Sequence, residues 1–421
     1  MKKVLILLWL LLPASLLLSC GTSYSSSGGG GGTVTKRAYV SQDVSSGTSS
    51  AGLLVVDAQN DVQGFVAPVS AGATPGMMVV MPNRVGTLVF SAQDSLLSVI
   101  SNSSGSSVAT ATLPGFTESF VVSPDSRVAY AAVPTAFVSG QPPGVVKIVS
   151  LSTGAFTAEI DIPAVRYLSM SHSGNRILAF STGPDSVANT VAVITQASGT
   201  GNPTVTFIPG FDHPVSAFFS SDDNTAYVVN CGAECGGAQA SVQNLDLTTN
   251  TPGAPVFVPA ASVAVVNSTT MYLAGTPVPA SPCTGQTTKA TSCGLLTVFD
   301  LPTMTMKNSA NIVITDGYHN RMALGANGQL FVGAHTCTEI TAVNTGDEVR
   351  GCLSIYNTQT GAVVIPPDNG DVTGIQPIGS RNVVYLVQNG ELRIYDTTTD
   401  KLQTKQVDIN GVAVDVKTLD F

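Results

Sequence analysis

The chain has 421 residues and a net charge of −9, and only 11% of its residues are charged, against roughly 25% in an ordinary soluble domain. Its 18 Lys and Arg with 27 Asp and Glu are too few to cover many exposed helices, which argues against a helical bundle or a doubly wound α/β fold. The chain has no basic run longer than a pair, so nucleic acid is not expected as a partner. The 41 glycines and 24 prolines instead favour strands joined by turns.

Residues 1–19 have the pattern of an export signal. A lysine pair at 2–3 precedes a mostly apolar run at 4–18, which is shorter than the about 20 residues of a spanning helix and fits a signal peptide. The ending Leu-Leu-Ser-Cys at 17–20 resembles a bacterial lipobox. The resemblance implies a lipoprotein cut before Cys20, with diacylglycerol and palmitate-type chains on the cysteine. Gly21 after it favours the outer membrane or outer surface over the inner membrane. The alternative is an ordinary signal peptide with an incidental cysteine.

Residues 20–35 are rich in Gly and Ser, with five consecutive glycines at 28–32, and contain almost nothing to bury. We expect a flexible linker with a reach of about 20 Å, which joins the membrane anchor to a domain formed by residues 36–421. The glycines do not predict a phosphate loop, because no strand precedes them and no helix follows.

The segment 36–421 repeats a phrase of two strands joined by a polar loop. Aligned on one position of the first strand, the copies recur about every 49 residues, at Tyr39, Val89, Tyr130, Leu178, Tyr227, Tyr272, Phe331 and Tyr385. A period of about 40–50 residues with several strands per unit is typical of a propeller blade. The room between copies fits two more strands, so each unit has four, lettered A to D from the axis outwards. We predict an all-β propeller of eight four-stranded blades, or seven if the copy at Val89 or Leu178 is irregular.

The two ends of this domain predict how the ring closes. The first unit opens directly at its B strand, 37–41, and has no A strand of its own. The last unit has all four strands, with its D strand expected to end around 406–409, and then adds 411–416, which has the A-strand pattern. This C-terminal strand is expected to complete the first blade and remove the open sheet edge.

Two phrases carry a resemblance to a known family. The run 123–130 (Ser-Pro-Asp-Ser-Arg-Val-Ala-Tyr) and the ending 394–397 (Ile-Tyr-Asp-Thr) resemble the bacterial propeller repeats named for their Tyr-Val-Thr-Asn phrase, in the lactonase-like and surface-layer-like superfamily. Members are often seven-bladed and exported, and some related propellers are lactonases. The resemblance covers the whole domain but implies a fold rather than an activity. The tryptophan-aspartate propellers are excluded, because the only tryptophan, Trp9, belongs to the signal peptide.

Six cysteines remain after Cys20, in three pairs that each fall between the B and C strands of one blade. Cysteines of an exported protein are oxidised unless protected, and each pair brackets a loop short enough to close. We therefore predict three disulfides: Cys231–Cys235, Cys283–Cys293 and Cys337–Cys352. A zinc site across blades is the alternative, although no histidines have ligand spacing. The sequence indicates no cofactor.

Aspartates end several of the C strands, at Asp57, Asp246, Asp300 and Asp396. A metal or acid/base role is one interpretation. Each is followed by turn residues, so we expect its carboxylate to accept hydrogen bonds from backbone amides two residues on.

The segments that lead into A strands hold the candidate site, because successive A strands surround one axis. Glu118, Arg166, His213, Tyr318, His319 and Arg321 are the candidate ligand-binding residues, accompanied by Asp212, Asn320, Asp371 and Asn410. Charged and imidazole groups are scarce in this chain, so their presence on these segments is a mild enrichment. The first interpretation is that they only solvate a wet channel mouth. The second is a ligand or catalytic site, in which two arginines would suit an anionic ligand. No catalytic residue is assigned.

Three functions remain open on this sequence. A lipid-anchored binding or interaction module of the cell envelope, with a protein, small-molecule or carbohydrate ligand, fits best. A lactonase-like hydrolase acting through an activated water at the channel mouth is the second, although the two commonest hydrolase signatures are missing. A structural envelope component is the third. An enzyme is thus less expected than a binding protein.

Overall fold

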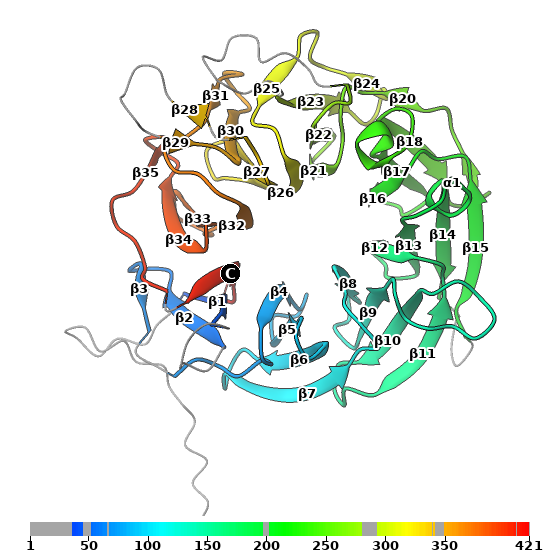
Figure 1. Cartoon of the computed structure of the whole chain (residues 1–421), viewed down its shortest axis with the longest axis horizontal. Coiled ribbons are helices and arrows are strands. Elements are labelled where there is room, and N and C mark those ends of the chain that lie inside the picture. The colour runs from blue at the N-terminus through cyan, green and yellow to red at the C-terminus, as the bar shows by residue number, and fades with distance from the viewer. Residues whose placement is uncertain are drawn as a thin grey trace, which may run out of the picture.

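The computed structural model describes residues 36–44, 52–64, 67–196, 202–279, 293–338, 340–341, 349–409 and 411–420. Within these residues the chain forms eight four-stranded antiparallel blades around a central axis, a β-propeller (Figure 1). The predicted fold is confirmed, with eight blades rather than seven. The copies at Val89 and Leu178 are regular B strands like the others.

Each blade contributes one strand to each of four rings, and blades are numbered from the one that holds β1. The A strands are β36 (Val412–Thr418), β4 (Pro75–Val80), β8 (Ser119–Val122), β12 (Val165–Met170), β16 (Pro214–Phe219), β21 (Val263–Asn267), β26 (Tyr318–Leu324) and β32 (Val372–Pro377). The B strands are β1 (Arg37–Asp43), β5 (Gly86–Ser91), β9 (Val128–Val133), β13 (Arg176–Ser181), β17 (Thr225–Asn230), β22 (Thr270–Gly275), β27 (Gln329–His335) and β33 (Val383–Gln388).

The outer two rings follow the same order. The C strands are β2 (Leu53–Asp57), β6 (Leu96–Ser101), β10 (Val145–Ser150), β14 (Thr190–Thr195), β18 (Ser241–Asp246), β23 (Gly294–Asp300), β30 (Leu353–Asn357) and β34 (Glu391–Asp396). The D strands are β3 (Val62–Gln63), β7 (Ser106–Thr112), β11 (Phe156–Asp161), β15 (Thr204–Pro209), β19 (Thr251–Pro252) with β20 (Val256–Phe257), β24 (Thr305–Met306) with β25 (Ile312–Ile314), β31 (Val363–Val364) and β35 (Lys401–Leu402).

Few elements lie outside this plan. The described residues also hold a small hairpin, β28 (Ile340–Thr341) with β29 (Val349–Arg350), one α-helical turn, α1 (Asp185–Ala188), and a 3₁₀ turn, Gly232–Cys235. No helix among the described residues is long and apolar enough to cross a membrane.

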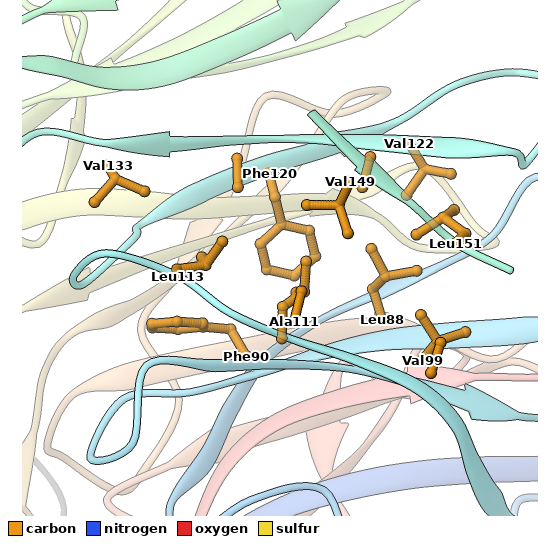
Figure 2. Close-up of a cluster of buried hydrophobic side chains, with 14 of the residues drawn as sticks. Leu88, Phe90, Val99, Ala111, Leu113, Phe120, Val122, Val133, Val149 and Leu151 are labelled. Carbon is orange, nitrogen blue, oxygen red and sulfur yellow. The ribbon is translucent and has the colours of Figure 1, made fainter. Parts of the chain in front are cut away.

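The B and C strands are apolar on both faces because every blade is packed between two others. In β5, Leu88 and Phe90 belong to the core shared with blade 3, whereas Val89 belongs to the core shared with blade 1. Successive side chains of a strand point to opposite faces, so alternation here divides one strand between two cores. Figure 2 shows the first core, in which Phe120 and Val122 of blade 3 lie against the side chains of blade 2.

The C-terminal strand closes the ring as expected. β36 pairs with β1 antiparallel, with Val416 opposite Val40, and the C-terminus lies at the inner edge of the first blade (Figure 1). A buried cluster adds a second connection between the last and first blades. Both Nη atoms of Arg381 donate to the Asp61 carboxylate, at 2.6 and 2.8 Å, and the Tyr385 hydroxyl donates to it at 2.6 Å. Burial alone would raise the pKa of Asp61, but these bonds outweigh it and lower the pKa.

The aspartates that end C strands have the predicted structural role. Their carboxylates accept backbone amides two or three residues on, with Asp57 to Gln59 at 2.9 Å and Asp246 to Thr248 at 2.7 Å as examples. Asp396 and Asp300 make the same kind of bond. Each carboxylate therefore fixes the turn to the D strand.

Candidate functional site

A cavity of about 570 Å³ lies at the end of the ring where the A strands begin. Its lining includes residues from all eight blades, mostly near the start of the A strand, together with residues at the ends of B strands such as Asp43, Phe90 and His335. The A strands are the innermost strands (Figure 1), so this cavity is the mouth of the central channel. Each B strand runs antiparallel to its A strand and ends at the same mouth.

A bulge near the start of most A strands directs side chains into this mouth. The pairing register between the A and B strands shifts there in six of the eight blades. The extra residue is Arg166, Val215, Asn320, Thr373 or Val414 in five of these blades, and all five line the cavity. Bulges re-aim side chains and are frequent beside binding sites. Here one repeated irregularity places five side chains at the channel mouth.

The turn into β26 depends on a glycine. Gly317 has a φ of +102°, and a Cβ there would lie 2.4 Å from the carbonyl oxygen of His335. Only glycine suits both conditions, and the turn delivers Tyr318 directly to the cavity.

Four side chains form a chain of contacts across the mouth from blade 3 to blade 7. Arg166 is paired with Glu118, with Nη2 to Oε1 at 3.1 Å, and its guanidinium lies 5.1 Å from the centre of the Tyr167 ring. The hydroxyls of Tyr167 and Tyr318 are 2.9 Å apart. The bond to Glu118 raises the pKa of Arg166, and burial raises the pKa of Tyr167. The charge of Arg166 is therefore already neutralised within the protein.

Arg321 differs from Arg166 because no carboxylate of the described residues forms a salt bridge with it. Its Nε donates to the Thr373 carbonyl at 2.8 Å, and its Nη1 donates to the Asn320 carbonyl at 3.1 Å. These bonds hold the guanidinium against the cavity wall, where Arg321 is part of the lining. The side chain thus presents a fixed positive charge without a salt bridge among the described residues, in a lining that also includes Asp43, Glu118 and Asp415.

His335 is a lining residue that the sequence analysis missed. Its Nδ1 lies 3.3 Å from Oδ2 of Asp371, whose Oδ1 accepts the Thr336 amide at 2.7 Å. The residue ends β27. B strands end where A strands begin, so examining the last residues of the predicted B strands would have found it.

The structure places the two predicted histidines away from the lining of this cavity. His319 is fully buried, with Nε2 2.9 Å from the Thr315 carbonyl oxygen, and burial lowers its pKa to about 4, so it is neutral. His213 is also buried, with Nδ1 3.2 Å from Asp212. The Asp212 carboxylate also accepts the Gln239 amide at 2.7 Å, which fixes the B-to-C loop that carries the first disulfide.

The other predicted residues do lie at the cavity. Its lining includes Glu118, Arg166, Tyr318, Arg321 and Asn320, whereas Asn410 lies outside the described residues.

The B-to-C loops at the same end of the ring carry the disulfides. Cys231 is bonded to Cys235 and Cys337 to Cys352, as predicted. Cys293 is also disulfide-bonded, and its expected partner, Cys283, lies outside the described residues. No group of three or more metal-ligand side chains occurs among the residues that the structure describes.

Glu234, inside the first disulfide loop, is a further residue that the sequence analysis did not single out. Its Oε2 accepts the Thr276 amide of the next blade at 3.0 Å, and it lines a separate pocket of about 200 Å³. A Cβ on Gly275 would lie 2.6 Å from this oxygen and 2.7 Å from the backbone nitrogen of Ala261, so glycine is required at the end of the neighbouring strand β22. Burial raises the pKa of Glu234 to about 7.

Comparison with known proteins supports the fold. No protein-family model and no curated protein sequence matches the chain. Among solved structures, dihydro-heme d1 dehydrogenase NirN in complex with DHE has a TM-score of 0.60 at 13% identity, over 92% of this chain and 76% of that one. The Dos1 propeller has a TM-score of 0.58 at 9% identity, over 80% and 85%.

A third structure, a putative 6-phosphogluconolactonase from Bacteroides uniformis, has a TM-score of 0.50 at 12% identity, over 91% of this chain and 99% of that one. At such identities the likeness is one of fold alone. The resemblance to Tyr-Val-Thr-Asn repeats remains a prediction. The chain's place among the β-propellers follows from the architecture and these neighbours together.

Proposed function

We propose that the protein binds a small organic anion in the channel-mouth cavity. The observation that carries this proposal is Arg321, a fixed guanidinium without an acidic partner among the described residues, in the wall of a cavity of about 570 Å³. Ligand pockets typically measure about 300–1,000 Å³, and a guanidinium offers paired donors to a carboxylate, sulfonate or phosphate.

Titration with the fluorescent anion 8-anilinonaphthalene-1-sulfonate tests this function. The probe has an aromatic body and one sulfonate, so it should bind the wild-type cavity with a rise in emission. Arg321→Met removes a charge-assisted hydrogen bond worth about 1.5–3 kcal/mol and should weaken binding by roughly 10-fold to 150-fold. Arg127→Met, at an exposed turn on the opposite end of the ring, is the matched control. Equal affinity of both variants would refute the proposal.

We also propose that the protein acts as a lipid-anchored module of the cell envelope. This part rests on residues 1–20, which lie outside the described residues. Mass spectrometry of the membrane fraction should find a modified Cys20 at the N-terminus, and Cys20→Ala should release the protein from the membrane. Native protein that begins at another residue and stays soluble would contradict the anchor.

A lactonase-like hydrolase is the second candidate, favoured by the pairing of His335 with Asp371 at the same cavity. A carboxylate on Nδ1 orients an imidazole for use of Nε2 as a general base. Nε2 of His335 is buried in this structure, so a rotation of the side chain would first have to expose it to the cavity. It would then take a proton from a water molecule while the water oxygen attacks the lactone carbonyl. The ring C–O bond would then break, with the proton passing to the leaving alkoxide. Arg321 would stabilise the developing oxyanion.

Lactone hydrolysis, followed as acid release over a panel of γ- and δ-lactones, separates this candidate from simple binding. His335→Ala should abolish turnover, whereas His172→Ala, an exposed histidine at a turn on the opposite end, should not. Absence of turnover by the wild-type protein would rule out the hydrolase and keep simple binding as the proposed function. If the sulfonate probe also fails to bind, the structural role is the function that remains.

A further inference from the structure

The first disulfide joins two cysteines in unequal surroundings. Cys231 and Cys235 are four residues apart in the B-to-C loop of blade 5. Cys231 is fully buried, whereas Cys235 is half-buried. The next residue, Gly236, is exposed, and a Cβ placed on it would have only Nε2 of His213 within 4 Å among the described residues beyond its chain neighbours. No side chain at Gly236 therefore screens Cys235, which is the cysteine that a thiol from solution reaches first.

The enclosed cysteine shares a pocket with an acid. Cys231 and Glu234 both line the separate pocket of about 200 Å³, together with Thr276 and Val278 of blade 6. The Thr276 amide donates to Oε2 of Glu234 at 3.0 Å, which holds the carboxyl at this pocket. A sulfur released from the disulfide at Cys231 would thus remain in a space that Glu234 lines.

Glu234 can donate a proton in the neutral pH range. Burial raises its pKa to about 7, hydrogen bonds from the Thr276 amide and the Ser262 side chain oppose this rise, and no charged group among the described residues contributes. The carboxyl is therefore mostly protonated at pH 6 and mostly ionised at pH 8. The other ionisable groups packed against the loop are His213 and Asp212, which lie 3.2 Å apart.

The loop meets the requirements of thiol–disulfide exchange. This reaction needs one sulfur open to a thiolate and another that leaves easily. A thiolate left alone in a buried pocket is unfavourable, so a proton given to Cys231 as the bond breaks makes its sulfur a better leaving group. Loop closure also stabilises this bond less than the bond between Cys337 and Cys352, whose separation is 15 residues instead of 4, because the closure entropy grows with loop length.

We propose that the Cys231–Cys235 bond is a thiol–disulfide exchange site that accepts electrons from a dithiol. One thiolate of the dithiol attacks Sγ of Cys235, and the disulfide breaks with its electron pair on Sγ of Cys231. Glu234 gives its proton to that sulfur and becomes a carboxylate. The second thiol loses its proton to solvent and attacks the first sulfur of the dithiol, which releases Cys235 as a thiolate that takes a proton from water. The dithiol leaves as a disulfide, and the loop keeps two thiols.

A partner disulfide reverses these steps and oxidises the loop again. This activity goes beyond the proposed binding function and does not use the channel-mouth cavity, so the failure of either leaves the other standing.

Reduction of the native protein by dithiothreitol, a small dithiol, tests the site. Samples are quenched with N-ethylmaleimide at intervals, and peptide mapping by mass spectrometry follows each disulfide separately. At pH 6 the Cys231–Cys235 bond should be reduced roughly tenfold or more faster than the Cys337–Cys352 bond, since a positioned proton donor typically contributes about 10²-fold or more. Circular dichroism should show a folded ring throughout. Equal rates, or faster reduction of Cys337–Cys352, would overturn the proposal.

Glu234→Gln identifies the proton donor, because glutamine can still accept the Thr276 amide but has no proton to give. The ratio of the wild-type to the variant reduction rate at the first disulfide should be roughly tenfold or more at pH 6 and fall towards one above pH 8. The ionisation of dithiothreitol and of His213 is common to both proteins and cancels in this ratio. A ratio that does not change with pH would mean that Glu234 only supports the loop, and would overturn its role.

Two controls isolate the effect of Glu234. Reduction of Cys337–Cys352 should proceed at the same rate in the wild type and in Glu234→Gln. Glu391→Gln, which changes an exposed glutamate at the same end of the ring, should leave reduction of the first disulfide unchanged. A similar slowing in Glu391→Gln would assign the effect to surface charge and overturn the role of Glu234.

Single-cysteine variants assign the attacked sulfur. Cys231→Ser leaves Cys235 as a free thiol, and Cys235→Ser leaves Cys231. With 5,5′-dithiobis(2-nitrobenzoate), the Cys235 thiol should form a mixed disulfide in the folded protein, whereas the Cys231 thiol should react only after unfolding in urea. Equal reaction of the two thiols in folded protein, as judged by thermal melts, would overturn the proposed sequence of attack.

Discussion

Glu234→Gln should change how the stability of the propeller depends on pH. The Glu234 carboxyl links two blades through the Thr276 amide, and burial raises its pKa from 4.5 to about 7. The unfolded chain loses this proton near pH 4.5, but the folded protein keeps it until about pH 7. Between these values the folded state binds more protons, so its free energy of unfolding falls as pH rises and levels off above pH 7.

The size of this effect follows from the pKa difference. Each pKa unit corresponds to about 1.4 kcal/mol, so the stability lost across the window is roughly 3 kcal/mol at most. For a ring of this length that is a decrease in Tm of about 4 °C. Glutamine has no proton to lose and can still accept the Thr276 amide, so the variant should lack this component.

Thermal melts of the wild-type protein and the Glu234→Gln variant from pH 4.5 to pH 9 measure this pH-dependent loss of stability. The Tm of wild type minus that of Glu234→Gln should fall by about 3 °C between pH 5 and pH 8, which is most of the full effect. Glu159→Gln, a partly exposed carboxyl of β11, controls for the loss of one surface charge. A difference that stays constant with pH, or a Glu234 carboxyl that titrates near its ordinary pKa by ¹³C NMR, would refute the reasoning.

Three further changes test the packing, the closure and the loops. Phe120→Ala opens the core between blades 2 and 3 and should cost about 3–5 kcal/mol in urea unfolding; a loss below about 1 kcal/mol would contradict that core. Arg381→Ala leaves the Asp61 carboxylate buried without its cation and should cost about 3–5 kcal/mol at neutral pH, with part of the loss restored by adding Asp61→Asn. The double variant Cys231→Ser, Cys235→Ser opens a short loop and should lower stability by about 2 kcal/mol with the ring intact by circular dichroism; global unfolding would show that the loop holds the blades together.

The inner strands could be predicted from the sequence because each is buried on two faces. Val89 and its neighbours Leu88 and Phe90 serve different cores, so the whole B strand is apolar and its recurrence is visible. The D strands pack on fewer neighbours, and several have only two residues. The last of them was expected to end near 406–409. Its regular part is Lys401–Leu402, and the chain pairs with the C strand once more through a bridge between Val407 and Leu392.

The candidate site was harder to predict because the A strands are irregular. In β26 the bulge falls at Asn320, between His319 and Arg321. A bulge adds one residue and changes which side chains face the axis, so alternation along the sequence cannot tell that His319 is buried while Asn320 lines the cavity. His335 was not predicted for another reason. It reaches the channel mouth from the end of a B strand, whereas the sequence analysis considered only the segments before A strands.

A crystal structure of the protein with bound 8-anilinonaphthalene-1-sulfonate tests the central claim most directly. We expect the probe inside the ring of A strands, with its sulfonate within hydrogen-bonding distance of the Arg321 guanidinium and its rings against the lining residues Phe90 and Phe116. A probe bound on the outer rim or at the opposite end of the ring, with the channel mouth empty, would contradict the claim.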